Sequence, residues 1–238
     1  MAYEVTQPSN IGFQKSFNIL FSRYLRKSGY TLGALPNEQV IHNRFWEWYL
    51  NADTYGIVDI TIADGTRYEP TPYLIINEIL NRLELKPDDV FADLGCGKGR
   101  SLLMAARRNI KKVIGVEFDS QLLQVAERNI ANLKNIRPEI ELSNCLAQKY
   151  DFSNVTIIYM YNPFGPDTID EVLDEVHKTL ITNPRDFRIA YVNPQHDEVL
   201  EQRDWLEQYD LWYEVDFPDF YIYPHQPRGV SYWRFKAP

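Results

Sequence analysis

The stretch "FADLGCGKGR", residues 91–100, places three glycines within five residues, directly after one apolar run and before another. A strand that ends in such a turn and leads into a helix leaves unpaired backbone N–H groups at the positive end of the helix dipole. Because the glycines carry no side chains, a polar ligand can approach this backbone closely. The stretch therefore predicts a strand, a ligand-binding turn and the start of a helix.

Size, charge and cysteine usage limit the class of protein. The 238 residues are 45% hydrophobic, which is enough for one full-sized core. The net charge of -8 argues against binding to the phosphate backbone of nucleic acids. Cys96 and Cys145 lie far apart without metal-ligand or disulfide spacing, and no apolar run approaches the ~20 residues of a membrane span. We therefore expect a cytoplasmic protein without a metal site or a membrane anchor.

After residue 86, short apolar runs alternate with helical patterns, which is typical of an α/β fold with a parallel sheet covered on both faces. Strands are expected at 89–95, 111–118, 139–144, 155–162 and 186–193. Helices are expected at 100–109, 120–133 and 167–180. The aromatic stretches 211–217 and 229–236 predict a closing antiparallel pair.

The first 66 residues have a different pattern. Apolar residues at helical spacing within 13–25 and 40–49 predict two amphipathic helices, so residues 1–66 form an N-terminal helical cap on a domain of residues 67–238. The cap is either a layer packed on the sheet or a lid over a substrate. Thr71 as the capping residue and Pro72 at the first helical position predict another helix start.

The spacing of the glycines favours one nucleoside ligand over another. Gly95, Gly97 and Gly99 are one residue tighter than the Gly-x-Gly-x-x-Gly pattern of dinucleotide sites. Asp93 would repel a pyrophosphate but can accept a hydrogen bond from an ammonium group. Glu117, at the end of the second strand, is placed for two ribose hydroxyls in either kind of site. The pattern favours S-adenosylmethionine, and a NAD-dependent oxidoreductase is the weaker alternative.

Residues 89–130, "DVFADLGCGKGRSLLMAARRNIKKVIGVEFDSQLLQVAERNI", resemble the first two motifs of the class I, seven-stranded S-adenosylmethionine-dependent methyltransferases. The stretches "NADTYGIVDI", "RYEPTPY", "LGCGKGR", "YNPFG" and "YVNPQH" are similar to those of a bacterial group of this class whose substrate is generally unassigned. The resemblance implies a doubly wound, Rossmann-like sheet of order 3-2-1-4-5-7-6 whose last strand is antiparallel. The loop "RYEP" also resembles a loop that closes over the methionine end of the cofactor in some lysine methyltransferases.

The resemblance extends to the cofactor contacts, with one departure. Many of these enzymes carry an Asp after the third strand that accepts from the adenine amino group, but Leu146 stands there in this sequence. Either Asn144 replaces that contact, or backbone atoms and apolar packing hold the adenine. The predicted cofactor contacts are Tyr68, Glu69, Asp93, Gly95, Cys96, Gly97, Gly99, Glu117, Phe118, Asn144, Cys145 and Asn162.

The fourth strand ends in "MYNPFG", at the sheet edge where open parallel sheets bind ligands. The amide oxygen of Asn162 can accept a hydrogen bond from an amine. Pro163 has no N–H, so a neighbouring carbonyl stays free to accept as well, and the Phe164 ring can form a wall of the acceptor site. This turn resembles the Asn-Pro-Pro-Tyr motif of amino-group methyltransferases, with one proline and with Phe in place of Tyr. Together with Tyr161, these three residues are the predicted catalytic residues.

The chemistry of the acceptor decides whether a base is needed. A neutral amine already has its nucleophilic lone pair, so the site mainly positions and desolvates it. A hydroxyl acceptor needs a base, and the candidates are His196, His225 and Tyr161. We predict methyl transfer to a nitrogen of a protein side chain, such as lysine, or of a small amine. The alternative is a non-catalytic S-adenosylmethionine-binding scaffold protein whose acceptor pocket is blocked by the N-terminal helices.

Overall fold

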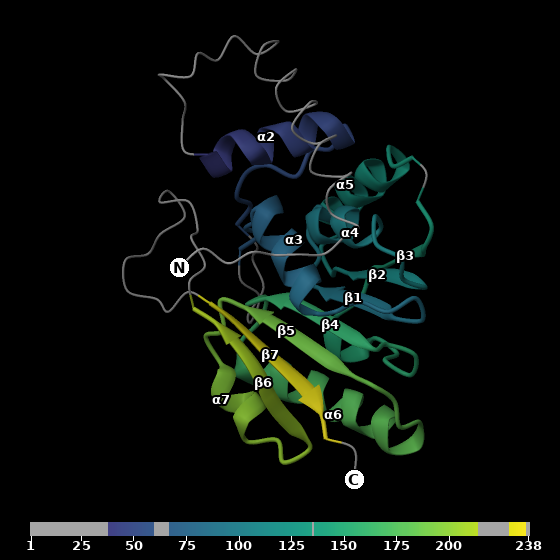
Figure 1. The fold of residues 1–238 in the computed structure, drawn as a ribbon, viewed down its shortest axis with the longest axis vertical. Coiled ribbons are helices and arrows are strands. Elements are labelled where there is room, and N and C mark those ends of the chain that lie inside the picture. The colour runs from purple at the N-terminus through teal and green to yellow at the C-terminus, as the bar shows by residue number, and fades with distance from the viewer. Residues whose placement is uncertain (1–37, 60–66, 135, 214–228, 237–238) are drawn as a thin grey trace, which may run out of the picture.

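The computed structural model describes residues 38–59, 67–134, 136–213 and 229–236. Its centre is a seven-stranded sheet of order β3-β2-β1-β4-β5-β7-β6, in which β7 is antiparallel to both of its neighbours (Figure 1). The strands are β1 (Val90–Leu94), β2 (Lys112–Val116), β3 (Glu139–Ser143), β4 (Ile157–Tyr161), β5 (Arg188–Val192), β6 (Leu206–Trp212) and β7 (Val230–Phe235). The sheet order and the antiparallel last strand that the resemblance implies are confirmed.

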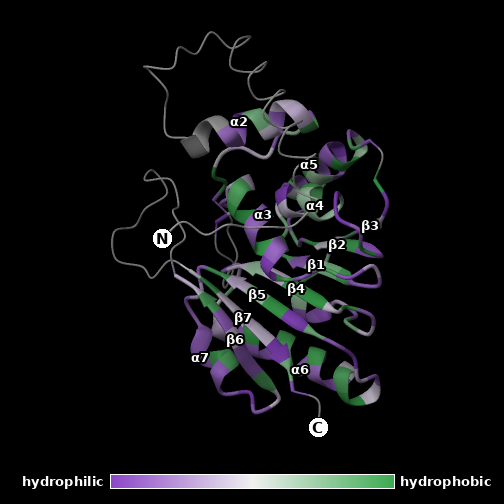
Figure 2. Ribbon diagram, viewed as in Figure 1, coloured by the Kyte–Doolittle hydropathy of each residue, from purple (hydrophilic) through white to green (hydrophobic). Residues whose placement is uncertain are grey.

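Helices cover both faces of this sheet. They are α2 (Glu38–Leu50), α3 (Tyr73–Arg82), α4 (Arg100–Ala105), α5 (Ser120–Ala131), the 3-10 turn η1 (Ala147–Lys149), α6 (Pro166–Thr182) and α7 (Asp197–Glu201). Buried residues of α2, α3, α4 and α5 form one core with the sheet, and those of α6 and α7 form the other. Figure 2 shows hydrophobic residues on the central strands, and every residue of β1 and β5 is buried.

The helix predicted at 40–49 is confirmed as α2. Phe45, Trp46 and Leu50 are buried in the same core as Phe91 of β1 and Tyr159 of β4. The helix packs directly on α3, where the Trp46 and Tyr73 ring centroids are 6.1 Å apart, so it forms an outer layer over the helices of this face of the sheet (Figure 1). The helix predicted at 13–25 and the expected domain boundary at residue 66 lie outside the described residues. 

Two boundaries differ from the sequence prediction. The helix expected at 100–109 ends at Ala105, and the strand expected at 211–217 is β6, which begins five residues earlier at Leu206. The aromatic pattern missed the start of β6 because β6 is an edge strand, and Glu207 and Gln208 there are exposed. Polar residues are expected on the open side of an edge strand, but they do not stand out from a loop in the sequence.

The predicted start of α3 is wrong in detail. Pro72 is the N-cap residue rather than the first helical residue, and the Thr71 side chain makes no capping bond. Instead, the Thr71 and Tyr159 hydroxyls lie 2.7 Å apart in a hydrogen bond. The free N–H of Tyr73 is satisfied by Asn43 of α2, whose Oδ1 lies 3.0 Å away. A tertiary contact thus replaces the local cap that the sequence suggested.

The buried guanidinium of Arg100 joins α2 to the start of α4. Its Nε donates to the Thr54 hydroxyl at 2.7 Å, Nη2 to Glu47 Oε1 at 3.0 Å, and Nη1 to the Thr71 carbonyl at 3.2 Å. The guanidinium also lies 4.6 Å from the centre of the Tyr73 ring, as in a cation–π contact. One side chain therefore holds three segments that are distant in the sequence.

Arg100→Ala should lower the free energy of unfolding by about 3–5 kcal/mol, because it leaves a largely buried carboxylate and several polar groups without their donor. Urea unfolding measures this loss. Arg137→Ala is the matched control, since Arg137 is exposed and should change stability by less than about 0.5 kcal/mol. Equal losses in the two variants would contradict the structural role of Arg100.

Candidate active site

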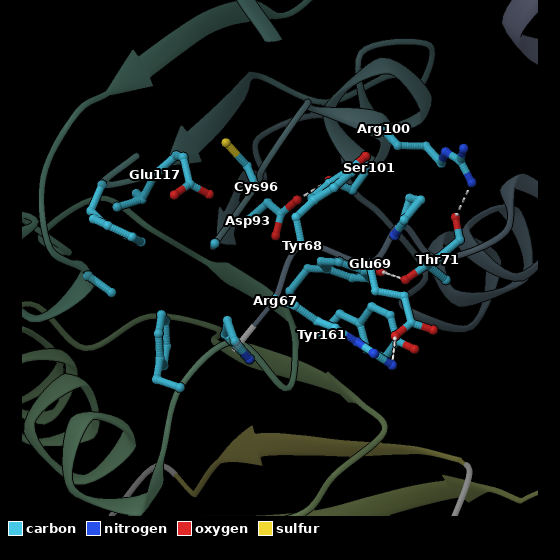
Figure 3. A pocket seen from close by; sticks show the side chains of 18 of the residues that line it. Arg67, Tyr68, Glu69, Thr71, Asp93, Cys96, Arg100, Ser101, Glu117 and Tyr161 are labelled. Atoms are coloured by element: carbon cyan, nitrogen blue, oxygen red, sulfur yellow. Dashed lines mark hydrogen bonds and ion pairs between the residues drawn. The ribbon is translucent and has the colours of Figure 1, made fainter. Parts of the chain in front are cut away.

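A cavity of about 220 Å³ lies at the carboxyl ends of the central strands, between the glycine turn, the loop 67–71 and η1 (Figure 3). The structure brings most of the predicted site residues together there. Those that line it are Tyr68, Glu69, Asp93, Gly95, Cys96, Glu117, Phe118, Cys145, Tyr161, Pro163 and Phe164. Gly97, Gly99, Asn144 and Asn162 are not among the lining residues.

The glycines of the turn make room for protein side chains as well as for a ligand. All three have φ in the left-handed region, between +53° and +82°. A Cβ added to Gly95 would lie 2.7 Å from Pro163 Cβ, and one added to Gly97 would lie 2.2 Å from Tyr68 Cδ2. The turn is therefore the surface on which the loop 67–71 and the turn after β4 pack.

Glu117 is buried at the end of β2, and its carboxylate points into the cavity at the end opposite Glu69 (Figure 3). Its Oε2 accepts from the Gly97 N–H at 2.8 Å and its Oε1 from the Asp119 N–H at 2.9 Å. Burial raises the pKa of this carboxyl, whereas these N–H groups lower it. The backbone thus fixes both oxygens, and each keeps a lone pair for a ligand hydroxyl.

Asn144 and Leu146 both belong to the short connection between β3 and η1. The Asn144 amide nitrogen donates to the carbonyls of Glu117 and Phe118, at 2.9 and 2.8 Å, so it braces the end of β2. Leu146 lines the cavity but is 46% exposed, which makes it a rim residue and not part of the core. Gln148, which the sequence analysis did not select, is the polar side chain of η1 that lines the cavity.

Asp93 lies in the middle of the cavity wall and is 4% exposed (Figure 3). It accepts a hydrogen bond from the Ser101 hydroxyl. Burial, and to a lesser extent the nearby Glu117, raise the pKa of Asp93 to about 7, against the opposing effect of Ser101. A carboxylate held in this way gains most from a cationic ligand group, which would restore its ionised form.

The loop 67–71 contributes all five of its residues to the cavity. The Tyr68 hydroxyl donates to the Thr54 carbonyl at 2.7 Å, and Arg67 forms an ion pair with Glu69 at 3.2 Å. Tyr159, also missed by the sequence analysis, lines the cavity beside its partner Thr71. The sequence did hold a signal for Tyr159: it lies two residues before Tyr161 on the same strand, so both side chains point to one face of β4.

The acceptor end of the cavity differs from expectation at Asn162. Tyr161, Pro163 and Phe164 line the cavity, whereas the Asn162 amide oxygen accepts from the Tyr191 hydroxyl at 3.0 Å. Of the two candidate bases that the structure describes, Tyr161 lines the cavity and His196 does not. The Nδ1 atom of His196 instead lies 3.5 Å from Glu198 Oε1, and His225 is outside the described residues.

Neither a metal centre nor a membrane span emerges from the part of the chain that the structure describes. No cluster of three or more His, Cys, Asp or Glu side chains there is arranged to hold a metal ion. None of the described helices combines the length and the apolar character needed to cross a membrane.

Comparison with known proteins agrees with this geometry. Residues 91–183 match the family described as "Methyltransferase domain". A protein-lysine N-methyltransferase of Saccharolobus islandicus is 34% identical over 96 residues, which are 40% of this chain and 58% of that protein. A ribosomal protein L11 methyltransferase of Vibrio campbellii is 32% identical over 165 residues, 63% of this chain and 53% of the relative. The chain thus spans little more than half the length of these curated relatives.

The solved structures support the fold. An S-adenosylmethionine-dependent O-methyltransferase of Thermotoga maritima superposes with a TM-score of 0.51 at 17% identity, over 72% of this chain and 68% of that one. Residues 91–183 thus match a methyltransferase domain, and the sheet that contains them has the seven-stranded order of the class I methyltransferases that the motifs resemble.

We expect ligand-free Asp93→Asn to be more stable than the wild type at pH 8. This advantage should be smaller at pH 5. The pKa of Asp93 is about 7 in the folded protein and 3.8 in the unfolded chain. The wild type therefore loses stability as the pH rises from 3.8 to about 7, because the unfolded chain ionises this carboxyl more readily than the folded protein does. The advantage of the variant should grow by roughly 2.5 kcal/mol from pH 5 to pH 8. Thermal unfolding measures it, with the exposed Asp204→Asn as control. An advantage independent of pH would contradict the burial of a titrating carboxyl.

Leu146→Asp should keep or modestly tighten the binding of S-adenosylhomocysteine. The exposed Leu146 can be exchanged without opening the core, and the new carboxylate can accept from the adenine amino group. Calorimetric titration of both proteins gives the two dissociation constants. A loss of tenfold or more would show that the apolar Leu146 side chain itself packs against the ligand or the core, so that a carboxylate is not tolerated there.

Proposed function

We propose that this chain transfers a methyl group from S-adenosylmethionine to a nitrogen of a protein side chain, such as lysine, or of a small amine. One observation carries the proposal. A single cavity connects the buried carboxylates of Asp93 and Glu117 with the Tyr161, Pro163 and Phe164 walls at the end of β4. Cofactor and acceptor can therefore meet without crossing the protein.

The residues of the cofactor end fit the chemical parts of S-adenosylmethionine. The fixed carboxylate oxygens of Glu117 suit the two ribose hydroxyls, and Asp93 suits the ammonium of the methionine part. Tyr68 and Glu69 face that part from the opposite loop. For the adenine we propose the carboxamide of Gln148, because Gln148 lines the cavity and Asn144 does not.

The acceptor end suits an amine better than a hydroxyl. In the transfer, the lone pair of a neutral amine forms the new N–C bond while the S–C bond breaks and its electrons remain on sulfur as a neutral thioether. The amine then loses a proton to solvent. The protein must position and desolvate the amine, which the walls formed by Tyr161, Pro163 and Phe164 can do. His196 and Asp197, both near the end of β5, do not line the cavity, so of the candidate bases for a hydroxyl that the structure describes only the Tyr161 phenol is in place.

Two further observations support a cationic, protein-borne acceptor. Both relatives described above are named as protein methyltransferases, one of them for lysine. The net charge of -8 also attracts a lysine-rich surface more readily than a nucleic acid.

The proposed N-terminal cap of residues 1–66 contains α2, and none of the α2 side chains that the structure describes, residues 42–50, lines the cavity. This speaks against a scaffold protein whose acceptor pocket is blocked by that helix. The bond between Arg100 and Glu47 instead supports a structural role for this part of the cap.

The decisive experiment incubates the chain with methyl-labelled S-adenosylmethionine and cell extract, lysine-rich peptides or small amines. Label should appear on nitrogen, as a mass increase of one methyl group that survives mild alkali, which cleaves esters. Glu117→Ala should weaken S-adenosylhomocysteine binding by roughly 1.5–3 kcal/mol and reduce transfer at limiting cofactor. The exposed Glu139→Ala is its control.

The alternatives give different results in this experiment. Tight binding of S-adenosylhomocysteine without transfer to any acceptor would identify a scaffold protein. Binding of NAD in its place would identify an oxidoreductase. Unchanged affinity in Glu117→Ala would remove that residue from the ribose site.

A further inference from the structure

Two neighbouring strands of the sheet end in the same Asn-Pro dipeptide. Asn162 and Pro163 follow β4, and Asn193 and Pro194 follow β5, with the two strands paired in parallel. Both asparagines have positive φ, +38° and +49°, although a residue before proline prefers an extended backbone. Their surroundings must therefore hold both turns in this conformation.

The Tyr191 hydroxyl lies between these two turns. Burial raises the pKa of this hydroxyl, and the backbone N–H groups of His196 and Gln195 in the second turn lie near enough to oppose that effect. The hydroxyl donates to Asn162 Oδ1, 3.0 Å away in the first turn, because an amide oxygen can only accept. The Tyr191 ring is completely buried, so the hydroxyl is held in place from one side by the core.

This bond changes the role that Asn162 can have. Its oxygen, the atom expected to accept from the methyl acceptor, is already bound, and the residue does not line the cavity. Its neighbours Tyr161, Pro163 and Phe164 do line the cavity. Pro163 also packs directly on the glycine turn, where an added Cβ at Gly95 would come within 2.7 Å of it. A displacement of this turn therefore changes the distance between the acceptor wall and the cofactor turn.

We infer that Tyr191 is a positioning residue for methyl transfer, which acts through Asn162 to hold the acceptor-lining turn 161–164 in place. The inference rests on the proposed function. Methyl transfer requires an in-line approach, and a misplacement of about 1 Å can cost a factor on the order of a hundred in rate. Tyr191 and Asn162 thus form one unit that is coupled to the reacting atoms only through the backbone between them.

Tyr191→Phe removes only the hydroxyl and tests this role. With cell extract as the acceptor and saturating cofactor, the limiting rate of label transfer should fall by a factor on the order of ten to a hundred. The half-saturating concentration of extract, and the calorimetric affinity for S-adenosylhomocysteine, should change by less than about twofold, because neither binding surface has lost a contact. Tyr150→Phe is the matched control, since it removes a hydroxyl bonded to Glu141 at 2.9 Å, away from the cavity.

The double variant separates positioning from direct contact. If Tyr191 and Asn162 act as one unit, Tyr191→Phe with Asn162→Ala should be no slower than the slower single variant. Losses that multiply, or a raised half-saturation in Asn162→Ala alone, would show direct contact between Asn162 and the acceptor and overturn the inference. If Tyr191→Phe did not fold, Asn162→Asp, which keeps an acceptor for the hydroxyl, should be faster than Asn162→Ala.

The failure of the inference and that of the proposed function are distinguishable. Wild-type protein that binds S-adenosylhomocysteine but transfers no label contradicts both. Wild-type protein that transfers label, with Tyr191→Phe at the same rate, contradicts the positioning role alone.

Discussion

The buried guanidinium of Arg100 is the interaction on which the architecture of the cavity depends. The glycine turn ends at Arg100, and the opposite wall is the loop 67–71, yet both are bound to one residue, Thr54. The Tyr68 hydroxyl and Arg100 Nη2 donate to the Thr54 carbonyl, at 2.7 and 3.2 Å, while Arg100 Nε donates to its hydroxyl at 2.7 Å. A guanidinium has five donors in one plane, so it can satisfy a carbonyl, a hydroxyl and a carboxylate at once. A lysine in this place has a single donor atom and could not span these partners.

The two carboxylates of the cavity are supported to different degrees. Glu117 accepts from two backbone N–H groups, whereas Asp93 accepts from the Ser101 hydroxyl, and each is buried. A buried carboxylate without a cation or several donors reduces the stability of the folded protein at neutral pH. Asp93 is therefore the residue at which we expect the protein to lose stability without ligand and to regain it with a cationic one. This is the pattern expected of a group selected for binding rather than for folding.

The sequence predicted the parts of this site that depend on neighbours along the chain. Gly95, Gly97 and Gly99 lie between a strand and a helix within ten residues, so the turn was predictable from the sequence. The sheet order came from the resemblance. Arg100 was passed over because its partners lie 29 to 53 residues away. Thr71 was expected to cap the next helix, but Tyr159, 88 residues away, takes its hydroxyl. Local rules were overridden at positions where a side chain reaches a second segment, and those positions line or support the cavity.

The spacing of the three glycines now has a structural reason. Gly95 meets Pro163 from the turn after β4, Gly97 meets Tyr68 from the covering loop, and Gly99 meets Ala126 of α5, 3.2 Å from the position of an added Cβ. Alternate residues of the turn thus face three different elements, and each approach is close because no side chain intervenes. The unpaired N–H groups predicted for this turn are not found at the glycines, because Gly95 donates to the Val116 carbonyl, Gly97 to Glu117 and Gly99 to the Cys96 carbonyl. The absence of side chains therefore acts through shape, since it sets how near the turn after β4 comes to the glycine turn. A side chain at Gly95 would therefore push the acceptor wall away from the cofactor turn before it obstructed the cofactor itself.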